Sequence, residues 1–141
     1  MTKQFDVFLS YAHEDAPTAL MLAAYVERTT DLSVWTTDKM PPGAPWDRTI
    51  MEALRSASSV LVLLTPAASR SAWVAHELGA ALMADLPVVA VVSRPGLLKL
   101  LPAGTRVSST LDAENLSEER VVEVLSGLRQ RGFDQALRQA G

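Results

Sequence analysis

The chain has no cysteine and only two histidines, His13 and His76, among its 141 residues. Without thiols it has no disulfide framework, no thiolate zinc site and no cysteine nucleophile. Two histidines are too few for a histidine-rich metal centre, so we expect no bound metal. The absence of cysteine fits a reducing compartment, and the cytoplasm is the expected location.

Long hydrophobic stretches and charge runs of one sign are also missing. The longest apolar runs, near 60–64 and 86–92, are far shorter than the ~20 residues of a membrane span. Because Asp6 interrupts the first apolar run and no cleavage site follows it, we expect no signal peptide. The net charge is −3 with both signs interleaved, so neither nucleic acid nor membrane is an expected partner.

The composition is that of a folded globular protein, with 48% hydrophobic and 21% charged residues. A chain of this length can bury a hydrophobic core without disulfides or metal. It contains no internal repeat and no linker-like tract. We therefore expect a single domain over residues 1–141, with its core within about 4–130.

Short apolar runs alternate with amphipathic segments along the chain. The predicted strands are 5–11, 32–35, 59–65, 87–93 and 105–110. The predicted helices are 16–28, 47–57, 69–85 and 117–131, with a turn or short helix within 94–104. Continuous apolar strands separated by helices indicate a parallel sheet that is covered on both faces.

The predicted fold is a flavodoxin-like, doubly wound α/β domain with five parallel strands in the order 2-1-3-4-5 and helices on both faces. In this order, ligands bind at the carboxyl ends of the strands, near the switch point between the first and third strands. The loops expected there are 10–16, 36–46 and 65–71. The helix predicted over 69–85 begins at the same rim.

One carboxylate lies on the apolar side of that helix. Trp73 and Leu78 belong to its apolar stripe, and Glu77 follows Trp73 by four residues, one turn along the same face. An unpaired buried carboxylate is costly. Glu77 therefore either reaches water at the edge of the stripe, paired with Arg70 or a lysine, or lines a cleft where it has a chemical role.

Three motifs carry a family resemblance: "FDVFLSYAHED" at 5–15, "DKMPPGAPW" at 38–46 and "SAWVAHEL" at 71–78. The first is similar to the opening box of TIR domains, the Toll/interleukin-1 receptor fold. The second resembles the long loop after the family's second strand. The third resembles a helix motif in which a glutamate follows a tryptophan by four residues. The resemblance covers about residues 4–130.

The resemblance implies an activity and a setting. Many bacterial and plant TIR domains cleave the nicotinamide–ribose bond of NAD+, and some cyclise the ADP-ribose. By resemblance, Glu77 is the catalytic carboxylate, NAD+ is a substrate and no cofactor is required. The family also implies homo-oligomers formed through the loop at Met40, Pro41, Pro42 and Gly43, and a sensor or effector partner. The implied setting is cytoplasmic anti-phage immunity or, alternatively, a secreted interference role.

The chemistry is consistent with a single carboxylate. Nicotinamide leaves as a neutral molecule, so the reaction needs no general acid, unlike ordinary glycoside hydrolysis. Glu77 would stabilise the positive charge that grows on the ribose, or take a proton from the attacking group. Trp73 is expected to pack under the ribose or the nicotinamide. Many family members have a basic residue near 12–13, where this chain has Ala12 and His13, so no phosphate contact is carried over there.

Further residues are candidates for the NAD+ site. Ser10 either hydrogen-bonds the nicotinamide amide or phosphates, or stabilises a turn. Asp38 either touches the ligand or closes an Asx turn. Trp46 either walls the pocket or anchors its loop on the core. Gly43 is expected to adopt a positive φ angle, and His76 to lie on the surface.

Three other functions stay open. A non-catalytic TIR module would act by homotypic assembly alone, and NAD+ turnover would separate it from the enzyme. A response-regulator receiver needs an aspartate at the end of the third strand and a lysine after the fifth. Here Leu64 and Thr65 end the third strand and no lysine follows the fifth. A nucleoside deoxyribosyltransferase-like enzyme also uses a rim glutamate and would show nucleoside exchange.

Overall fold

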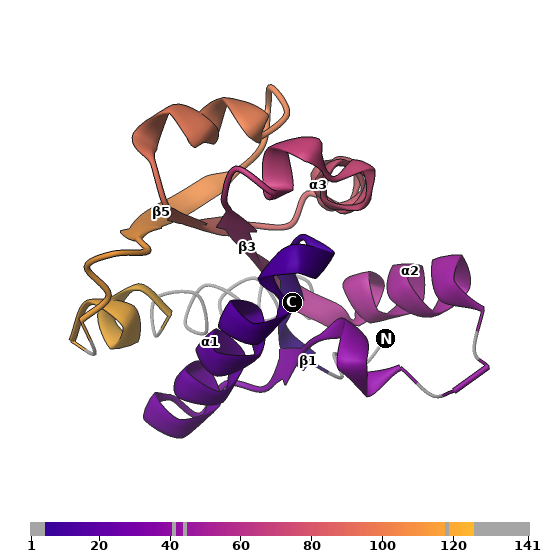
Figure 1. Cartoon of the computed structure of the whole chain (residues 1–141). Helices are drawn as coiled ribbons and strands as arrows, with labels where there is room; N and C mark the ends of the chain where they lie inside the picture. Colours follow the sequence, from indigo (N-terminus) through magenta and orange to yellow (C-terminus); the bar gives the residue numbers. More distant parts are fainter. Residues whose placement is uncertain (1–4, 41, 44, 118, 126–141) are drawn as a thin grey trace, which may run out of the picture.

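The computed structural model describes residues 5–40, 42–43, 45–117 and 119–125. Within them, five parallel strands form one sheet in the order β2-β1-β3-β4-β5 (Figure 1). The strands are β1 (Phe5–Ser10), β2 (Val34–Trp35), β3 (Ala57–Leu64), β4 (Val88–Val92) and β5 (Val107–Asp112). The predicted doubly wound fold and its strand order are confirmed.

Helices cover both faces of this sheet. They are α1 (Ala16–Thr29), α2 (Trp46–Ser56), α3 (Ala72–Met83) and a helical segment over 119–125. One buried cluster joins α1 and the 119–125 segment to the sheet, and a second joins α2 and α3 to its other face (Figure 1). The rest of the helix predicted over 117–131, and the tail after it, lie outside the described residues.

Four short 3₁₀ turns complete the described elements. They are His13–Asp15, Thr37–Lys39, Ala68–Arg70 and Pro95–Leu100. The first three follow β1, β2 and β3 directly, so they gather at the carboxyl edge of the sheet. This is the edge where a doubly wound fold binds its ligands.

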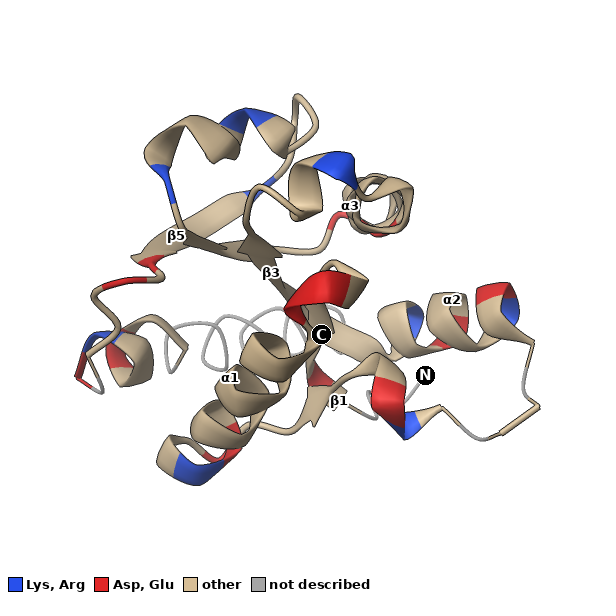
Figure 2. Ribbon diagram, in the orientation of Figure 1, with Lys and Arg blue, Asp and Glu red and all other residues tan. Residues whose placement is uncertain are grey.

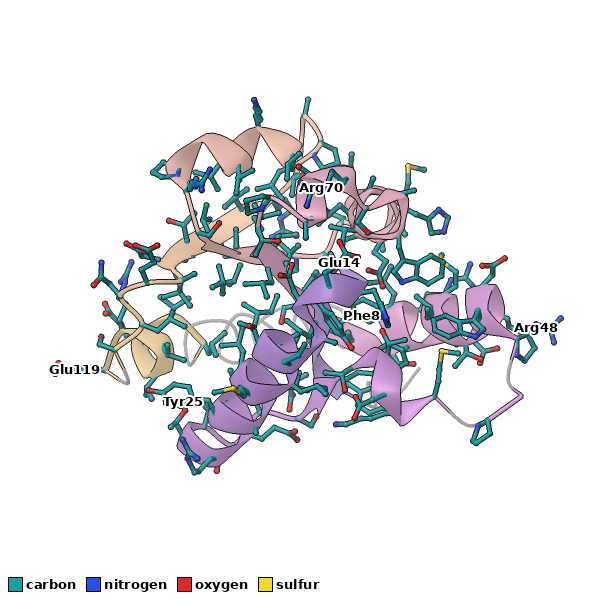
Figure 3. The ribbon with its side chains drawn as sticks, viewed as in Figure 1. Phe8, Glu14, Tyr25, Arg48, Arg70 and Glu119 are labelled. Atoms are coloured by element: carbon teal, nitrogen blue, oxygen red, sulfur yellow. The ribbon has the colours of Figure 1, made fainter. Side chains whose placement is uncertain are left out.

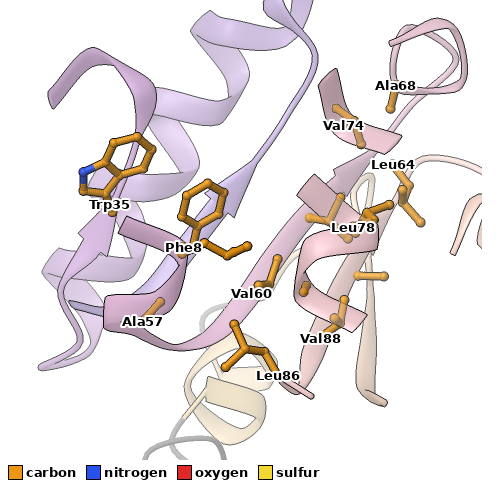
Figure 4. Close-up of a cluster of buried hydrophobic side chains, with 14 of the residues drawn as sticks. Phe8, Trp35, Ala57, Val60, Leu64, Ala68, Val74, Leu78, Leu86 and Val88 are labelled. Atoms are coloured by element: carbon orange, nitrogen blue, oxygen red, sulfur yellow. The ribbon is translucent and has the colours of Figure 1, made fainter. Parts of the chain in front are cut away.

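Alternate residues of the central strands face the two helical layers. Phe8 of β1 and Val60 of β3 belong to the cluster under α2 and α3 (Figure 4), whereas Leu9 and Leu61 belong to the cluster under α1. Phe8 also stacks on Trp35 of β2, with ring centroids 5.1 Å apart and planes at 14°. Ser10 comes two residues after Phe8, so its side chain faces the α3 side of the sheet.

The structure corrects several predicted boundaries. The third helix begins at Ala72 rather than at 69, because Ser71 caps it by accepting a hydrogen bond from the Val74 amide at 3.1 Å. Ala57, predicted as helical, is extended and begins β3. Only two residues of the predicted 32–35 strand pair with β1. The fifth strand starts two residues later than predicted, since Val107 pairs with Val88.

Candidate functional site

Glu77 is buried and hydrogen-bonded to the first strand. Its side chain is 2% exposed, and the Ser10 hydroxyl, which is fully buried, donates to Glu77 Oε1 at 2.7 Å. The two residues are 67 positions apart, and the bond closes because Ser10 and α3 share one face of the sheet. The alternative that Glu77 reaches water, paired with Arg70 or a lysine, is wrong.

Burial raises the pKa of the Glu77 carboxyl from 4.5 to about 8, and the hydrogen bond from Ser10 lowers that pKa in part. Loss of hydration penalises the charged form of a carboxyl, whereas a donor to that form stabilises it. At neutral pH the Glu77 carboxyl is therefore largely protonated and neutral. A neutral carboxyl avoids most of the cost of burying a charge.

A pocket of about 560 Å³ opens at the carboxyl edge of the sheet. Its walls come from the turns after β1, β2 and β3 and from the first turns of α1, α2 and α3. The aromatic lining residues are Tyr11, Trp46 and Trp73. The charged or titratable ones are His13, Glu14, Asp38 and Arg70. The volume falls within the range of small-molecule sites.

Two tryptophans form one wall of this pocket. The rings of Trp46 and Trp73 meet edge to face, with centroids 6.0 Å apart and planes at 75°. Trp46 is 57% exposed, so the alternative that it anchors its loop on the core is wrong. It is the first residue of α2, and its ring turns toward α3. His76 is exposed, as predicted, and its ring stacks on Trp73 at 6.1 Å.

Glu77 and Ser10 lie one layer beneath the pocket. Neither lines it, but each is next to a residue that does: Tyr11 follows Ser10 in the chain, and Trp73 precedes Glu77 by one helical turn. Burial raises the pKa of the Tyr11 phenol. The charges of Asp38 and Glu77 raise this pKa further, and hydrogen bonding to Thr37 lowers it. The Tyr11 ring is thus within electrostatic reach of both carboxyls.

Only some residues of the 36–46 loop line the pocket. Asp38 lines the pocket and accepts a hydrogen bond from the hydroxyl of Thr36. Met40 is half-buried against the core cluster under α2 and α3. Gly43 has the predicted positive φ, at +79°, and it is exposed outside the pocket lining, as is Pro42. Pro41 lies outside the described residues.

The turns after β1 and β3 are tied together. Asp15 occupies the N-cap position of α1, but its carboxylate accepts a hydrogen bond from the Thr65 hydroxyl instead of capping the helix. His13 and Glu14 stay exposed at the pocket, rather than serving as caps. Tyr11 was not predicted as a pocket residue, although its place directly after the buried end of β1 was a usable signal.

Among the described residues, no group of three or more histidine, aspartate or glutamate side chains is placed to hold a metal ion. The described helices also lack the combination of length and apolar character needed to cross a membrane. In and beside the pocket lie one buried carboxyl, one buried hydroxyl, aromatic rings and a few surface charges.

Solved structures share this fold. A metazoan TIR-STING receptor from C. gigas, in complex with 2′,3′-cGAMP, is similar with a TM-score of 0.70 at 18% identity over 87% of this chain and 40% of that one. The TIR domains of the activated Roq1 resistosome, which recognises the effector XopQ, are similar with a TM-score of 0.57 at 17% identity, over 98% of this chain and 100% of that one. A diflavin flavoprotein from Nostoc has a TM-score of 0.59 at 16% identity, over 96% of this chain and 97% of that one.

Sequence identities this low show only that the fold is shared. The family is established by a comparison of the sequence with family descriptions. No functionally curated protein matches the chain. The family description "TIR domain" matches residues 7–125, which include most of β1 with Ser10, the 36–46 loop and the helix that carries Glu77. With most of its length matched, the chain belongs to the TIR domain family.

Proposed function

We propose that this TIR domain is an NAD+ nucleosidase in which Glu77 is the catalytic carboxyl group. The observation that carries the proposal is the buried Ser10–Glu77 pair, which lies directly beneath an aromatic pocket at the carboxyl edge of the sheet. A buried titratable group beside a pocket, with a strongly raised pKa, is typical of functional sites. Glutamate side chains are rarely buried to this extent.

The proposed reaction breaks the bond between ribose C1′ and the nicotinamide nitrogen. The bonding pair leaves with nicotinamide, which departs neutral, and positive charge develops on C1′ and the ring oxygen. The ionised Glu77 carboxylate stabilises that charge. Attack at C1′ by water gives ADP-ribose, and attack by another nucleophilic atom of the same molecule gives a cyclic isomer; in each case the attacking group releases one proton. Trp73 packs against the ring or the ribose.

In the resting form Glu77 is neutral and covered, so activity requires two changes. The first is ionisation, which the cationic nicotinamide ring favours because an opposite charge nearby lowers a carboxyl pKa. The second is access, because Glu77 is buried and does not line the pocket, whereas the neighbouring Tyr11 and Trp73 form part of the pocket wall. We propose that self-assembly through the loop at Met40–Gly43 moves this wall. An isolated domain is then expected to turn over slowly.

We further propose that the domain works in the cytoplasm in antiviral immunity, with a sensor or effector partner supplying the trigger. Two structural relatives support an immune setting by their descriptions: the activated Roq1 resistosome, which recognises a pathogen effector, and a metazoan TIR-STING receptor. Both likenesses are of fold, so the setting needs its own test. That test is phage challenge of cells that express the wild-type or the Glu77→Gln protein.

NAD+ turnover tests the enzymatic proposal. Purified protein, at high concentration and with a crowding agent, is incubated with NAD+, and the products are separated by chromatography. We expect nicotinamide release by the wild type and a loss of at least ~10²-fold in Glu77→Gln. Glu52→Gln, on the exposed side of α2, is the matched control and retains activity. The product formed together with nicotinamide distinguishes the two routes: ADP-ribose indicates hydrolysis, and a cyclic isomer indicates cyclisation.

The alternative is a binding module that assembles without catalysis. The covered, neutral state of Glu77 favours this reading for the form described here. Wild-type protein that self-associates in sedimentation experiments but releases no nicotinamide would establish it. Equal turnover by the wild type and Glu77→Gln would instead show that the reaction exists and depends on another group.

A further inference from the structure

Arg70 is an unpaired cation on the wall of the pocket. It ends the 3₁₀ turn after β3, three residues before Trp73, and its side chain is exposed and lines the cavity. In the described part of the chain, its guanidinium makes no ion pair and no hydrogen bond, whereas Lys39, Arg106 and Arg120 are each paired with a carboxylate elsewhere. The guanidinium is therefore available to a ligand.

The charged side chains that line the pocket are of opposite sign at its two sides. Asp38 belongs to the turn after β2, and Arg70 to the turn after β3, with the turn after β1 between them. Figure 2 shows acidic residues on the turns after β1 and β2 and a basic residue on the turn beside α3. The turn after β2 also carries Lys39, but Lys39 pairs with Glu27 and does not line the pocket. Glu14 on the middle turn lines the same pocket as Arg70, and both are labelled in Figure 3.

We propose that Arg70 binds the diphosphate of a dinucleotide whose cationic end lies toward Asp38 and the buried Glu77. The proposal rests on NAD+ as the substrate and names the part of it that this side chain holds. NAD+ carries a positive pyridinium ring and a negative diphosphate, so its charges match the two sides of the pocket. A guanidinium suits phosphate oxygens because it is planar, always charged and offers several donors.

Two features of the site support this assignment. The turn after β1 brings His13 and Glu14 to the pocket but no lysine or arginine. Arg70 is then the one arginine or lysine that lines the described pocket. It also lies beside the amino end of the 12-residue helix α3, whose dipole adds positive potential at that side.

Substrates that differ in phosphate content test the assignment. Nicotinamide riboside keeps the cleavable bond without phosphate, and nicotinamide mononucleotide carries one. We expect Arg70→Gln to raise the KM for NAD+ about tenfold, with little change in kcat. The KM for nicotinamide mononucleotide should rise less, and that for nicotinamide riboside should not change. Arg70→Lys should restore part of the affinity for NAD+.

Arg94→Gln is the matched control, since Arg94 is exposed and does not line this pocket. An equal rise in KM for NAD+ and nicotinamide riboside would overturn the proposal, as would an unchanged KM for NAD+. A thermal unfolding curve like that of the wild type confirms that Arg70→Gln is folded. Added salt should raise the KM for NAD+ more in the wild type than in Arg70→Gln. Salt screens the ion pair between Arg70 and the diphosphate, which the variant lacks.

Binding without turnover separates this proposal from the enzymatic one. ADP-ribose and ADP are titrated by calorimetry into Glu77→Gln protein and into Glu77→Gln/Arg70→Gln protein. Weaker binding of both ligands by the double variant supports a diphosphate site, even if the wild type never cleaves NAD+. No binding by the Glu77→Gln protein, or equal binding by the two, would overturn the site while leaving NAD+ cleavage to its own assay.

Glu14 gives an effect of opposite sign. Its exposed carboxylate lines the same mouth and repels a diphosphate held at Arg70. Glu14→Gln should therefore lower the KM for NAD+ about two- to threefold and leave that for nicotinamide riboside unchanged. A higher KM for NAD+ in Glu14→Gln would contradict a phosphate position beside Arg70.

Discussion

Helices α1 and α3 cover opposite faces of the same central strands, and they differ in one buried residue. The buried side of α1 is entirely apolar, with Ala19, Leu22, Ala23 and Val26. That of α3 has the same number of residues, Val74, Glu77, Leu78 and Ala81, but one of them is a carboxylic acid. α1 thus buries only apolar groups, whereas α3 also buries a titratable group next to the pocket.

The largest expected effect tests the α1 side. Leu22→Ala should lower the free energy of unfolding by about 2–4 kcal/mol, because Leu22 is buried against the sheet and its removal leaves a cavity. Urea denaturation measures this loss. Activity per folded molecule, where NAD+ is cleaved, should not change. Met21→Ala, at an exposed position of the same helix, is the control and should cost little.

Glu77→Gln tests the α3 side, with an effect that depends on pH. The folded state holds the Glu77 proton up to about pH 8, whereas the unfolded state releases it near the ordinary carboxyl pKa of 4.5. The stability of the wild type should therefore fall as pH rises from 4.5 to 8 and then level off. Relative to the wild type, Glu77→Gln should gain about 2–4 kcal/mol over this window.

Denaturant unfolding of both proteins at pH 5, 7 and 9 measures that gain. Any constant cost from the unpaired amide of glutamine cancels when the pH trends are compared. Parallel trends would show that Glu77 ionises normally and would remove the distinction between α1 and α3.

Ser10→Ala should have a smaller effect on stability, about 1 kcal/mol, and a diagnostic effect on pH dependence. The Ser10 hydroxyl lowers the pKa of Glu77, so its loss raises that pKa further. If the ionised carboxylate is the active form, kcat/KM rises with pH through this pKa, and Ser10→Ala moves the rise to higher pH.

Ser59→Ala is the matched control for this shift. Ser59 is equally buried but donates to the Asp6 carbonyl at 3.1 Å. It should lose similar stability without moving the pH profile. A profile that moves alike in both variants would show that the shift is a general consequence of a lost buried hydroxyl.

The smallest effect on stability is expected at the pocket wall. Trp46→Ala removes a largely exposed ring and one edge-to-face contact with Trp73, so it should cost about 0.5 kcal/mol. Its KM for NAD+ should nonetheless rise, because the ring is part of the wall. Met83→Ala, at an exposed position of α3, should alter neither quantity.

Much of the fold could be predicted because it depends on local pattern. The run over 59–65 became β3, and the run over 87–93 became β4, since a strand buried on both faces must be continuously apolar. The errors occurred at boundaries of helices and strands that are set by tertiary contacts. Ala57 left the predicted helix for β3, and the fifth strand slid toward its pairing with Val88.

The site was predicted less completely than the fold. Trp73, Asp38 and Trp46 do line one pocket, but Ser10 and Glu77 lie beneath it and Gly43 lies outside it. The partnership of Ser10 with Glu77 could not be read from either segment. A hydroxyl at the end of a strand has many possible acceptors, and only the assembled sheet selects one.

The sequence by itself determined the alternation of strands and helices, the family motifs and the place of Glu77 on the same helical face as Trp73, because each depends on neighbours within a few residues. Only the tertiary structure decided that Glu77 is buried, that Ser10 donates to it and that its pKa lies near 8. The physical reason is that the hydration and hydrogen bonding of a carboxyl depend on everything around it, and here its hydrogen-bond partner is 67 residues away.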